Sequence, residues 1–365
     1  MHARIFSFRV LRRTLSPLSE RTFATHSQAT TFTQPSLRPS TVLGSLSALP
    51  NRDETPHLGT RFPASVQLSR LLAAQAPESD ALLADLATLI ARRGVVFFER
   101  QDITLDQQKQ LALRMGRLSG APASSGLHRH PISESTGELG ADTSVISSEG
   151  GIARGGVVED TRASKGWHSD ITFEHIPAAF SILKMHTLPP LGGDTLWASA
   201  YEAYDRLSPA FATFLEGLTA LHSAPFFLDQ ARAMGIPIQD PRGSPENTGS
   251  ELMAIHPVVR THPITNYKAL FVNASFTTRI LELHPDESAA VLAYLARHIS
   301  ENHDLQVRYR WAKDDVAIWD NRATLHTATN DYGRQRREGF RVVSIGERPF
   351  LDRASRSRRE ALGLR

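Results

Sequence analysis

The chain has 365 residues, of which 41% are hydrophobic and 22% charged, with 41 basic and 38 acidic side chains and a formal net charge of +3. These proportions are normal for a globular domain. The length allows two domains, although large β folds of about 250 residues often form one unit. The absence of Cys excludes a disulfide framework and any thiolate metal site. Histidine and carboxylate side chains are therefore the strong metal ligands that the sequence offers.

The first 52 residues differ from the rest in composition. They hold seven Arg, no Lys and one acidic residue, Glu20, with many Ser and Thr, which is typical of a mitochondrial transit peptide. Because Arg21-Thr22-Phe23-Ala24 resembles a matrix-processing site, we expect a transit peptide at 1–23, a linker at 24–57 and a protein of the mitochondrial matrix. A disordered tail on a cytoplasmic protein is the alternative. Arg9 interrupts the only candidate apolar run, so no membrane span is predicted.

Most of the basic charge lies in this leader. Residues 1–52 contribute seven positive charges and one negative charge, a net +6, which leaves 3 − 6 = −3 for the remainder. A nucleic-acid-binding domain would need a basic patch of its own. Apart from an Arg-rich tail at 353–365, which Glu360 dilutes, the sequence has none, so no nucleic acid partner is expected.

The region 58–352 mixes helical and strand patterns and is expected to form one domain. Apolar residues at helical spacing, capping residues and short β-branched runs identify the elements. A mixed but mainly β pattern of this kind fits a double-sheet jelly roll buttressed by helices. The predicted elements are a helix from a Ser79 cap to Gly94, a buried strand at Val95–Phe98, a helix opened by a Thr104–Gln107 capping box and continuing through Met115, helices from Ser208-Pro209 and over Asp286–Ser300, and strands over Leu305–Trp311 and Val316–Trp319.

Two stretches have little periodicity. Ser133–Gly166 is rich in Gly and Ser, and Gln230–Ser250 contains several Pro. Long irregular segments in a compact domain are usually functional lids or disordered insertions. We therefore expect that either stretch could close over a bound ligand.

One His-x-Asp pair and a remote histidine suggest a metal site. They are His168, Asp170 and His326, among fifteen histidines, so a chance match must be weighed. On an extended strand residues two apart share a side, which lets His168 and Asp170 hold one ion while Ser169 faces away. His326 must then come from another strand lying alongside. Two histidines and one carboxylate form the facial triad of oxygen-activating Fe(II) enzymes.

Two arginines after His326 strengthen this interpretation. The stretch Phe340–Ile345 is predicted to be a strand, and an extended backbone puts Arg337 and Arg341 on one face, opposite Arg336 and Phe340. Two inward guanidiniums are costly without anions, and their planar fork suits a carboxylate or a sulfonate. Two solvated surface arginines are the alternative.

Several longer motifs occur in an order that resembles the taurine/alkylsulfonate dioxygenase family, whose members depend on Fe(II) and 2-oxoglutarate. The resemblance extends from about Leu58 to about Phe350. The motifs that carry it are Trp167-His168-Ser169-Asp170-Ile171-Thr172-Phe173, Gly192-Gly193-Asp194-Thr195-Leu196-Trp197, His256-Pro257-Val258-Val259-Arg260-Thr261-His262-Pro263, Phe271-Val272-Asn273 through Phe276 to Ile280, Trp319-Asp320-Asn321-Arg322 through His326, Asp331-Tyr332 and Arg341.

The resemblance implies a role for each matching residue. It implies a double-stranded β-helix, cupin-like core, with Fe(II) as cofactor and 2-oxoglutarate and O2 as cosubstrates. The distal carboxylate of 2-oxoglutarate would be bound by Thr195 and Arg337. The remaining implied roles are iron ligation by His168, Asp170 and His326, recognition of an anionic substrate head by His130 and Arg341, and pocket walls at Ile171, Phe173 and Phe276.

The resemblance implies a reaction and leaves the substrate open. We expect hydroxylation of the carbon next to sulfur in an organic sulfonate, which releases sulfite and an aldehyde with succinate and CO2. Taurine-specific members have a tyrosine and an asparagine where this chain has Ser133 and Ser164, so taurine itself is in doubt. The same chemistry on a carboxylate, sulfate ester, aryloxyacetate or secondary metabolite is the alternative, followed by a non-catalytic cupin-like binding protein. The expected partner is a small anionic organic molecule, with no membrane, and a homo-oligomer is left open.

The leader generates a prediction about processing. A C-terminally tagged full-length protein should enter mitochondria and lose roughly its first two dozen residues, as an Arg-rich, acid-poor leader does. N-terminal sequencing of the imported protein measures the cleavage site. An intact Met1 on a cytosolic protein would rule out the transit peptide.

Overall fold

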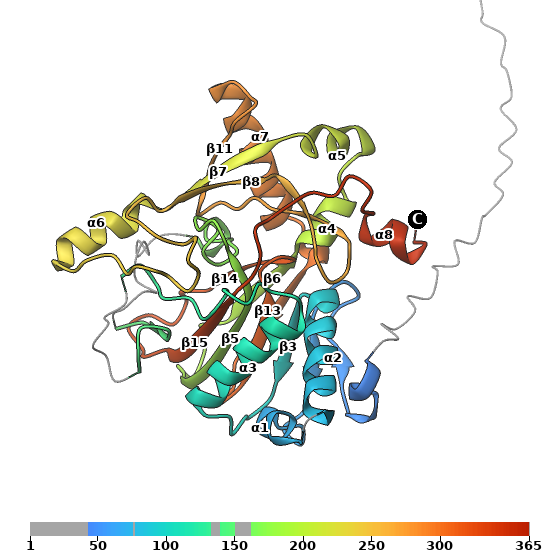
Figure 1. Cartoon of the computed structure of the whole chain (residues 1–365), viewed down its shortest axis with the longest axis vertical. Helices are drawn as coiled ribbons and strands as arrows, with labels where there is room; N and C mark the ends of the chain where they lie inside the picture. Colours follow the sequence, from blue (N-terminus) through green and yellow to red (C-terminus); the bar gives the residue numbers. More distant parts are fainter. Residues whose placement is uncertain (1–42, 76, 133–138, 150–161, 365) are drawn as a thin grey trace, which may run out of the picture. The chain divides into compact units, whose positions relative to one another are not determined.

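The computed structural model describes residues 43–75, 77–132, 139–149 and 162–364. The expected transit peptide, Ser133, and parts of the expected linker and of the 133–166 stretch lie outside these ranges. The described chain is rich in β structure and also contains helices (Figure 1).

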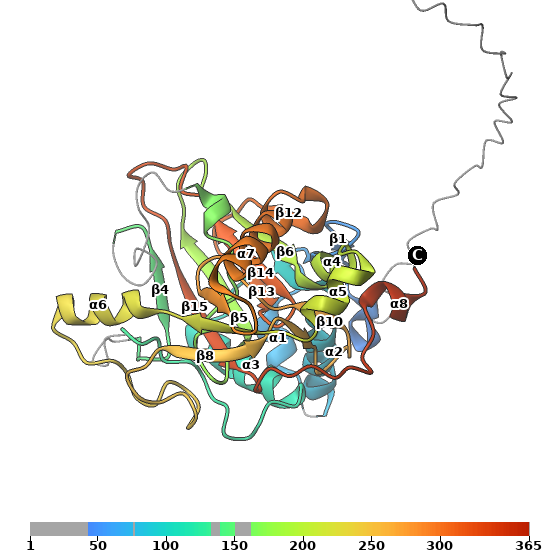
Figure 2. The same ribbon diagram turned by 90° about the horizontal axis from the view of Figure 1, so that it is seen from above.

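Seven strands form the largest sheet, in the order β1-β2-β3-β13-β5-β15-β4. Neighbouring strands are antiparallel except β2 and β3, which run parallel. β5, β15 and β4 lie side by side when the sheet is seen from above (Figure 2). The strands are β1 Arg52–Asp53, β2 Thr60–Phe62, β3 Val95–Phe98, β4 Ser144–Ser147, β5 Ala178–Thr187, β13 Val316–Asp320 and β15 Glu338–Ile345.

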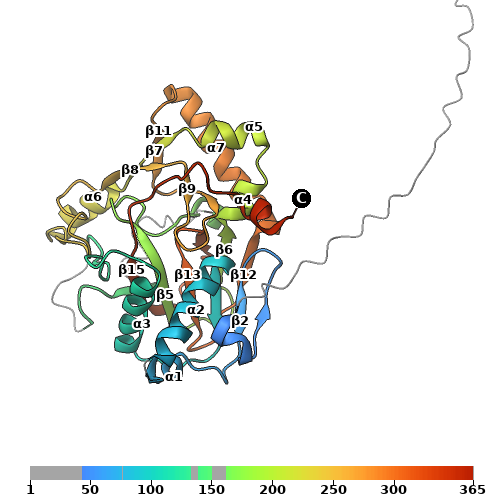
Figure 3. The same ribbon diagram turned by 45° about the vertical axis from the view of Figure 1, so that its right-hand side comes forward.

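Eight further strands form three smaller sheets. The sheet β12-β6-β14 carries Thr195 and His326 of the site described below, and the others are β11-β7-β8 and β10-β9. Figure 3 shows β11, β7 and β8 together, with α6 and α7 near them. The bounds are β6 Thr195–Ser199, β7 Thr219–Ser223, β8 Met253–Pro257, β9 Val259–Thr261, β10 Lys268–Leu270, β11 Thr277–Ile280, β12 Gln306–Tyr309 and β14 Thr324–Ala328.

Helices cover one face of the large sheet. α2 and α3 lie across its strands (Figure 1), and their apolar residues, such as Leu86 and Leu111, pack with Val96 and Phe98 in one buried cluster. The helices are α1 Leu68–Ala73, α2 Glu78–Arg93, α3 Leu105–Leu118, α4 Ala200–Asp205, α5 Pro209–Leu215, α6 Pro225–Met234, α7 Pro285–Ser300 and α8 Arg358–Leu362, with 3-10 turns η1 Gly44–Ala48, η3 Ala163–Lys165 and η4 His303–Leu305.

The second sheet packs against the opposite face through aromatic side chains. Because side chains alternate along a strand, Phe97 points away from α2. Its ring stacks on Tyr309 of β12 at 4.1 Å between centroids and meets Trp197 of β6 edge-on at 5.3 Å. Trp197 also contacts Trp319 of β13, at 5.7 Å. This aromatic layer fixes β6, and therefore its neighbour β14, against the large sheet.

Most predicted elements are confirmed. β3 is buried on both faces, Gly94 ends α2 with a φ of +73°, and the Thr104–Gln107 capping box opens α3. The prediction that Ser79 caps this helix is wrong, since α2 begins at Glu78 and its N-cap residue is Pro77. The Ser79 hydroxyl is buried instead and donates to the carbonyl of Leu71 at 2.9 Å, so tertiary contacts outweigh its capping preference.

The Arg-rich tail contains a docked helix. Arg358 of α8 is buried and donates to the carboxylate of Glu202 in α4 at 3.0 Å, and Arg359 pairs with the same carboxylate. Glu202 is fully buried and also accepts from Arg206 at 2.9 Å. A buried carboxylate needs such cationic partners, so this cluster joins the C-terminal helix to α4.

Within the described ranges, no helix combines the length and the apolar character needed to cross a membrane. The longest helices there, α2 and α7, have 16 residues each.

Candidate metal centre

Two segments far apart in the sequence meet at His168 and His326. They form an antiparallel bridge in which each backbone N–H donates to the other's carbonyl, at 3.0 and 2.7 Å. His326 lies in β14, which pairs with β6, so the prediction that it comes from a strand lying alongside is confirmed. The prediction of an extended strand through Asp170 is wrong, because His168 forms an isolated bridge and a turn begins at Asp170.

The turn after Asp170 has a strained backbone at Ile171. Its φ of +51° is a left-handed conformation, which is unfavourable for a β-branched residue. The turn brings Ile171 and Phe173 into one buried apolar cluster. Ser169 faces the other way, as expected, and its hydroxyl donates to the carbonyl of Thr324 at 2.7 Å.

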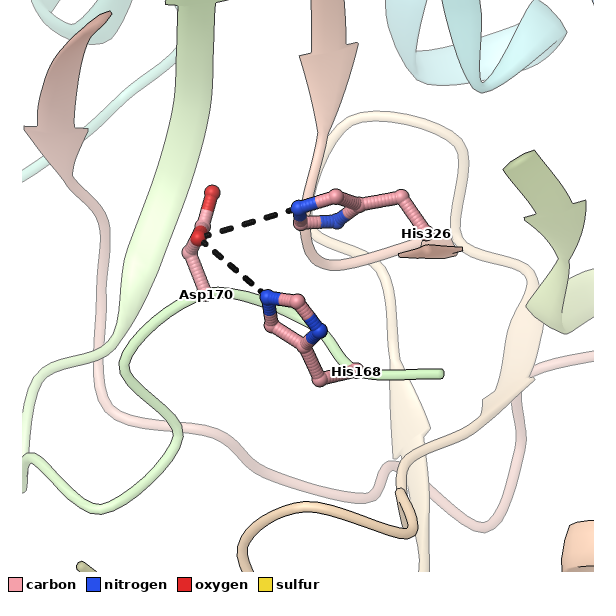
Figure 4. Close-up of side chains that lie close together, drawn as sticks. All are labelled: His168, Asp170 and His326. Carbon is pink, nitrogen blue, oxygen red and sulfur yellow. Dashed lines mark ion pairs between the residues drawn. The ribbon is translucent and has the colours of Figure 1, made fainter. Parts of the chain in front are cut away.

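The side chains of His168, Asp170 and His326 converge on one point (Figure 4). One ligand atom from each lies within 4.8 Å of the other two. The Nε2 atoms of both histidines are 3.9 Å from Oδ1 of Asp170. Two imidazoles and one carboxylate at this separation can share a single divalent ion, and this donor set fits Fe(II).

Neighbouring groups orient the triad. Nδ1 of His168 lies 2.7 Å from the carbonyl oxygen of Gly166, which can only accept, so Nδ1 carries the proton and Nε2 keeps a lone pair for a metal. Oδ2 of Asp170 accepts from the hydroxyl of Ser181 at 2.7 Å, which leaves Oδ1 directed at the histidines. The backbone N–H of Asp170 donates to Oδ1 of Asn321 at 2.9 Å.

The surroundings favour the protonation states that a metal needs. Burial lowers the pKa of His326 to about 3, with His168 as the next cause, and burial also lowers the pKa of His168. Burial would raise the pKa of Asp170, but Arg341 and then the two histidines bring it below its ordinary value. At neutral pH the site therefore holds two neutral imidazoles and one carboxylate, as metal binding requires.

A second polar group surrounds Arg337, which lies just before β15. Nε of Arg337 donates to the carbonyl of Gly193 at 2.8 Å, and Nη2 donates to the Thr195 hydroxyl at 3.2 Å. Gly193 has a φ of +72°, and a Cβ there would lie 2.9 Å from Cδ of Arg337, so glycine permits this approach. Trp311, which the sequence analysis did not assign to the site, donates to the same hydroxyl at 3.0 Å.

These contacts leave Arg337 and Thr195 ready for an anion. Both are buried, and no carboxylate of the described chain forms an ion pair with Arg337. Trp311 and Arg337 occupy both lone pairs of the Thr195 hydroxyl, so its proton is available for an acceptor. A buried guanidinium without a counter-ion is costly, and a carboxylate ligand would satisfy both groups.

Arg341 of β15 lies beside the triad. It is buried, as Arg337 is, whereas Arg336 is exposed, so the burial of these three arginines follows the predicted alternation. Nη1 of Arg341 donates to Oδ1 of Asp170 at 2.6 Å, a contact that the sequence analysis did not anticipate. Its buried Nε has no hydrogen-bond partner in the part of the chain that the structure describes.

His130 is also buried near this arginine. Burial, followed by His128 and Arg341, places its pKa well below the ordinary value, so the ring is neutral. Its Nδ1 accepts from the N–H of Ile132 at 3.4 Å, and its ring meets Phe227 of α6 edge-on at 4.6 Å. Sequence periodicity alone gave no reason to assign Phe227 to the site.

Aromatic side chains border the triad. The Phe276 ring lies 5.9 Å from the His168 ring and 5.2 Å from Phe173. Ile171, Phe173 and Phe276 are all buried in one cluster, so the structure brings the three predicted wall residues together. Ser164, by contrast, is exposed in η3.

Comparisons with known proteins agree with this geometry. Residues 51–343 match the model of the "Taurine catabolism dioxygenase TauD, TfdA family". The chain is 43% identical over 318 residues to the alpha-ketoglutarate-dependent dioxygenase oryG of Aspergillus oryzae, covering 84% of this chain and 91% of that protein. Alpha-ketoglutarate is another name for 2-oxoglutarate. The alpha-ketoglutarate-dependent sulfonate dioxygenase of Saccharomyces cerevisiae is 34% identical over 302 residues, covering 82% and 67%.

Solved structures show the same relationship. A putative alpha-ketoglutarate-dependent taurine dioxygenase from Burkholderia xenovorans superposes with a TM-score of 0.63 at 28% identity, over 83% of this chain and 91% of that one. The chain therefore belongs to the TauD, TfdA family and is a 2-oxoglutarate-dependent dioxygenase that uses Fe(II) and O2.

Proposed function

We propose that this dioxygenase hydroxylates the carbon next to sulfur in an organic sulfonate whose body is larger than that of taurine. The observation that carries the proposal is the buried Arg341, whose guanidinium reaches the triad beside His130 and an aromatic wall. A cation, a neutral imidazole and apolar rings together suit an anionic head attached to an apolar body. The relatives from Saccharomyces cerevisiae and Schizosaccharomyces pombe are named as a sulfonate dioxygenase and a putative sulfonate dioxygenase, respectively.

Each group has one role in this proposal. His168, Asp170 and His326 hold Fe(II), and Arg337 with Thr195 binds the distal carboxylate of 2-oxoglutarate. Arg341 and His130 hold the sulfonate, with Ile171, Phe173 and Phe276 along the substrate body. The core that presents them is a double-stranded β-helix, for which the two packed sheets and their aromatic layer are the support.

The reaction balances as an oxygenation of two substrates. O2 is the oxidant: 2-oxoglutarate gives it two electrons and the substrate C–H bond gives two more, and the bound Fe(II) would supply the site where this exchange occurs. One oxygen atom of O2 enters succinate with loss of CO2, and the other becomes the new hydroxyl group. The protein's residues position the substrate carbon and exclude water from it. The 1-hydroxysulfonate then breaks its C–S bond to give an aldehyde and sulfite.

Another anion is the second candidate. A relative from Pseudomonas putida, 32% identical over 274 residues, is named as a sulfate ester dioxygenase. A sulfate ester offers the same anionic oxygens to Arg341 and His130, and it would require no change in iron or cosubstrate binding. Carboxylates, aryloxyacetates and anionic secondary metabolites share that charge.

The metal assignment predicts loss of iron and activity together. Protein purified without oxygen should bind one Fe(II) per chain, and His168→Ala, Asp170→Ala and His326→Ala should each abolish succinate formation. Metal analysis and a succinate assay measure both quantities. His303→Ala is the matched control, because this histidine is exposed in η4 and is not part of the triad, and it should retain iron. Full turnover with iron bound in any triad variant would contradict the assignment.

The cosubstrate assignment predicts a selective change in affinity. Arg337→Gln should raise the KM for 2-oxoglutarate on the order of tenfold to a hundredfold, because a charged hydrogen bond contributes about 1.5–3 kcal/mol. Arg336→Gln is the control, since Arg336 is next to Arg337 in the sequence but its guanidinium is exposed and pairs with Glu338. Initial rates at varied 2-oxoglutarate measure the effect. A larger change in the KM of the prime substrate would mean that Arg337 and Arg341 exchange roles.

The substrate assignment predicts which compounds of a substrate panel are turned over fastest. Succinate and sulfite release from 1-hexanesulfonate should exceed that from taurine, with hexyl sulfate and phenoxyacetate testing the other anions. Arg341→Ala should depress turnover of every anionic substrate by tenfold or more and leave slow uncoupled decarboxylation of 2-oxoglutarate, provided that iron remains bound. The exposed Arg353→Ala is the control. Taurine as the best substrate, or a neutral substrate unaffected by Arg341→Ala, would overturn the proposal.

A further inference from the structure

The turn that follows Asp170 ends at a buried ion pair that the proposed chemistry does not use. The carboxylate of Glu174 accepts from Nε of Arg242 at 2.6 Å and from its Nη2 at 3.0 Å. The side chains of Glu174 and Arg242 are 2% and 1% exposed, respectively, so solvent does not weaken the pair. Two parallel bonds also fix the orientation of the two groups, which a single contact would not.

Arg242 organises the irregular segment between α6 and β8. Its Nη1 donates to the carbonyls of Gln239 at 3.1 Å and Gly249 at 2.8 Å. Asn247 of the same segment exchanges two bonds with the backbone of Ile176, at 2.9 and 2.8 Å. The 230–250 stretch, a candidate lid by its sequence, is therefore anchored to the chain that leaves the metal turn.

The same segment also contacts residues 126–131, the stretch that carries His130. The N–H of Gln239 donates to the carbonyl of Pro131 at 2.9 Å, and the N–H of Gly126 donates to the carbonyl of Gly243 at 2.8 Å. Gly243 has a φ of +90°, and a Cβ there would lie 2.3 Å from the carbonyl oxygen of Leu127, so the close approach requires glycine. His130 thus lies between two backbone contacts with this segment.

A third contact reaches the ion pair itself. Nε2 of His128 lies 3.6 Å from Oε1 of Glu174, and both side chains are 2% exposed. His128 and His130 are two residues apart in the same stretch, and their rings meet edge-on. Their rings are 6.1 Å apart. Glu174 therefore contacts the metal turn, the 236–250 segment and the His130 stretch.

We propose that Glu174 and Arg242 are positioning residues that fix His130 relative to Asp170 and Arg341. The ion pair sets the distance between the metal turn and the 126–131 stretch, and the 236–250 segment transmits this constraint through Gln239 and Gly243. The effect on substrate binding rests on the proposed function, because it requires that His130 meets the prime substrate. The coupling between the two segments does not.

The first measurement is independent of any substrate. Hydrogen–deuterium exchange should quicken in peptides covering both 126–131 and 236–250 in Glu174→Gln and Arg242→Gln. Glu202→Gln is the matched control, since it breaks an equally buried cluster elsewhere, and it should quicken exchange only around α4 and α8. Unchanged exchange at 126–131 in both pair variants would overturn the coupling, whatever the enzyme's substrate is.

The second measurement separates positioning from stability. With 1-hexanesulfonate as probe, Glu174→Gln should raise its KM about tenfold or more, as displaced binding groups do, and change the KM for 2-oxoglutarate less than about twofold. The double variant Glu174→Gln/Arg242→Gln should recover most of the lost stability, because neither charge is left buried alone, and should keep the raised KM. The pair would have a purely structural role if the KM for 1-hexanesulfonate returned to the wild-type value in the double variant together with stability. The same conclusion would follow if this KM did not change in Glu174→Gln.

A third variant tests the positioning role in a protein that is expected to stay folded. Arg242→Lys keeps the charge and loses the bidentate geometry, so it should fold and show a smaller rise in the KM for 1-hexanesulfonate than Arg242→Gln. If 1-hexanesulfonate is not turned over by the unmodified enzyme, the proposed function fails while the exchange experiment still decides the coupling. Wild-type KM values in Arg242→Lys and Arg242→Gln alike would overturn the positioning role.

Discussion

The site depends on one backbone interaction, the antiparallel bridge between His168 and His326. Side chains that belong to distant parts of the sequence can share an ion only if their backbones are held in a fixed register. The bridge supplies that register, and the contacts of Ser169 with Thr324 and of Asp170 with Asn321 extend it on either side. β14 is in turn paired with β6, whose Trp197 is held in the aromatic layer against the large sheet. The position of the metal ligands thus follows from the packing of the two sheets.

Contacts with neighbouring residues offset the backbone strain in the turn after Asp170. A left-handed β-branched residue costs about 1–3 kcal/mol and persists only where neighbouring contacts determine it. Here Nε2 of His256 donates to the carbonyls of Thr172 and Glu174, at 2.9 and 3.0 Å. Asn273 donates to the Thr172 hydroxyl at 3.0 Å. These contacts hold both ends of the turn, so the strain at Ile171 is a consequence of placing Asp170 and Phe173 on neighbouring sides of one site.

Local sequence signals predicted the regular elements well and the site only where its residues follow regular geometry. The Thr104 capping box, the β3 run and the shared face of Arg337 and Arg341 are properties of a short stretch, and each is confirmed. The position of the Ser79 hydroxyl and the backbone conformation of Ile171 depend on contacts with other segments. The spacing of residues in the sequence does not predict such contacts. The same reason explains why Trp311, Phe227 and the Glu174–Arg242 pair had no signal in the sequence. Substrate selectivity depends on such distant contacts as well, and Ser164, which its place in the sequence assigned to the substrate pocket, is exposed in η3.

The two buried arginines of the site, Arg337 and Arg341, differ in their hydrogen-bond partners. Arg337 has a carbonyl and a hydroxyl as neighbours but no carboxylate among the described residues, so its charge is left for a ligand that brings one. Arg341 shares Oδ1 of Asp170, the oxygen that also faces both histidines. A metal ion at the triad would compete with Arg341 for that oxygen, because both are cations directed at the same lone pairs. Metal binding would therefore weaken the contact between Asp170 and Arg341 and free the guanidinium of Arg341 for the anionic substrate that we propose. Under the proposed function, one carboxylate would couple metal binding to substrate recognition by Arg341, whereas Arg337, which we propose to bind the cosubstrate, contacts Gly193 and Thr195 instead of Asp170.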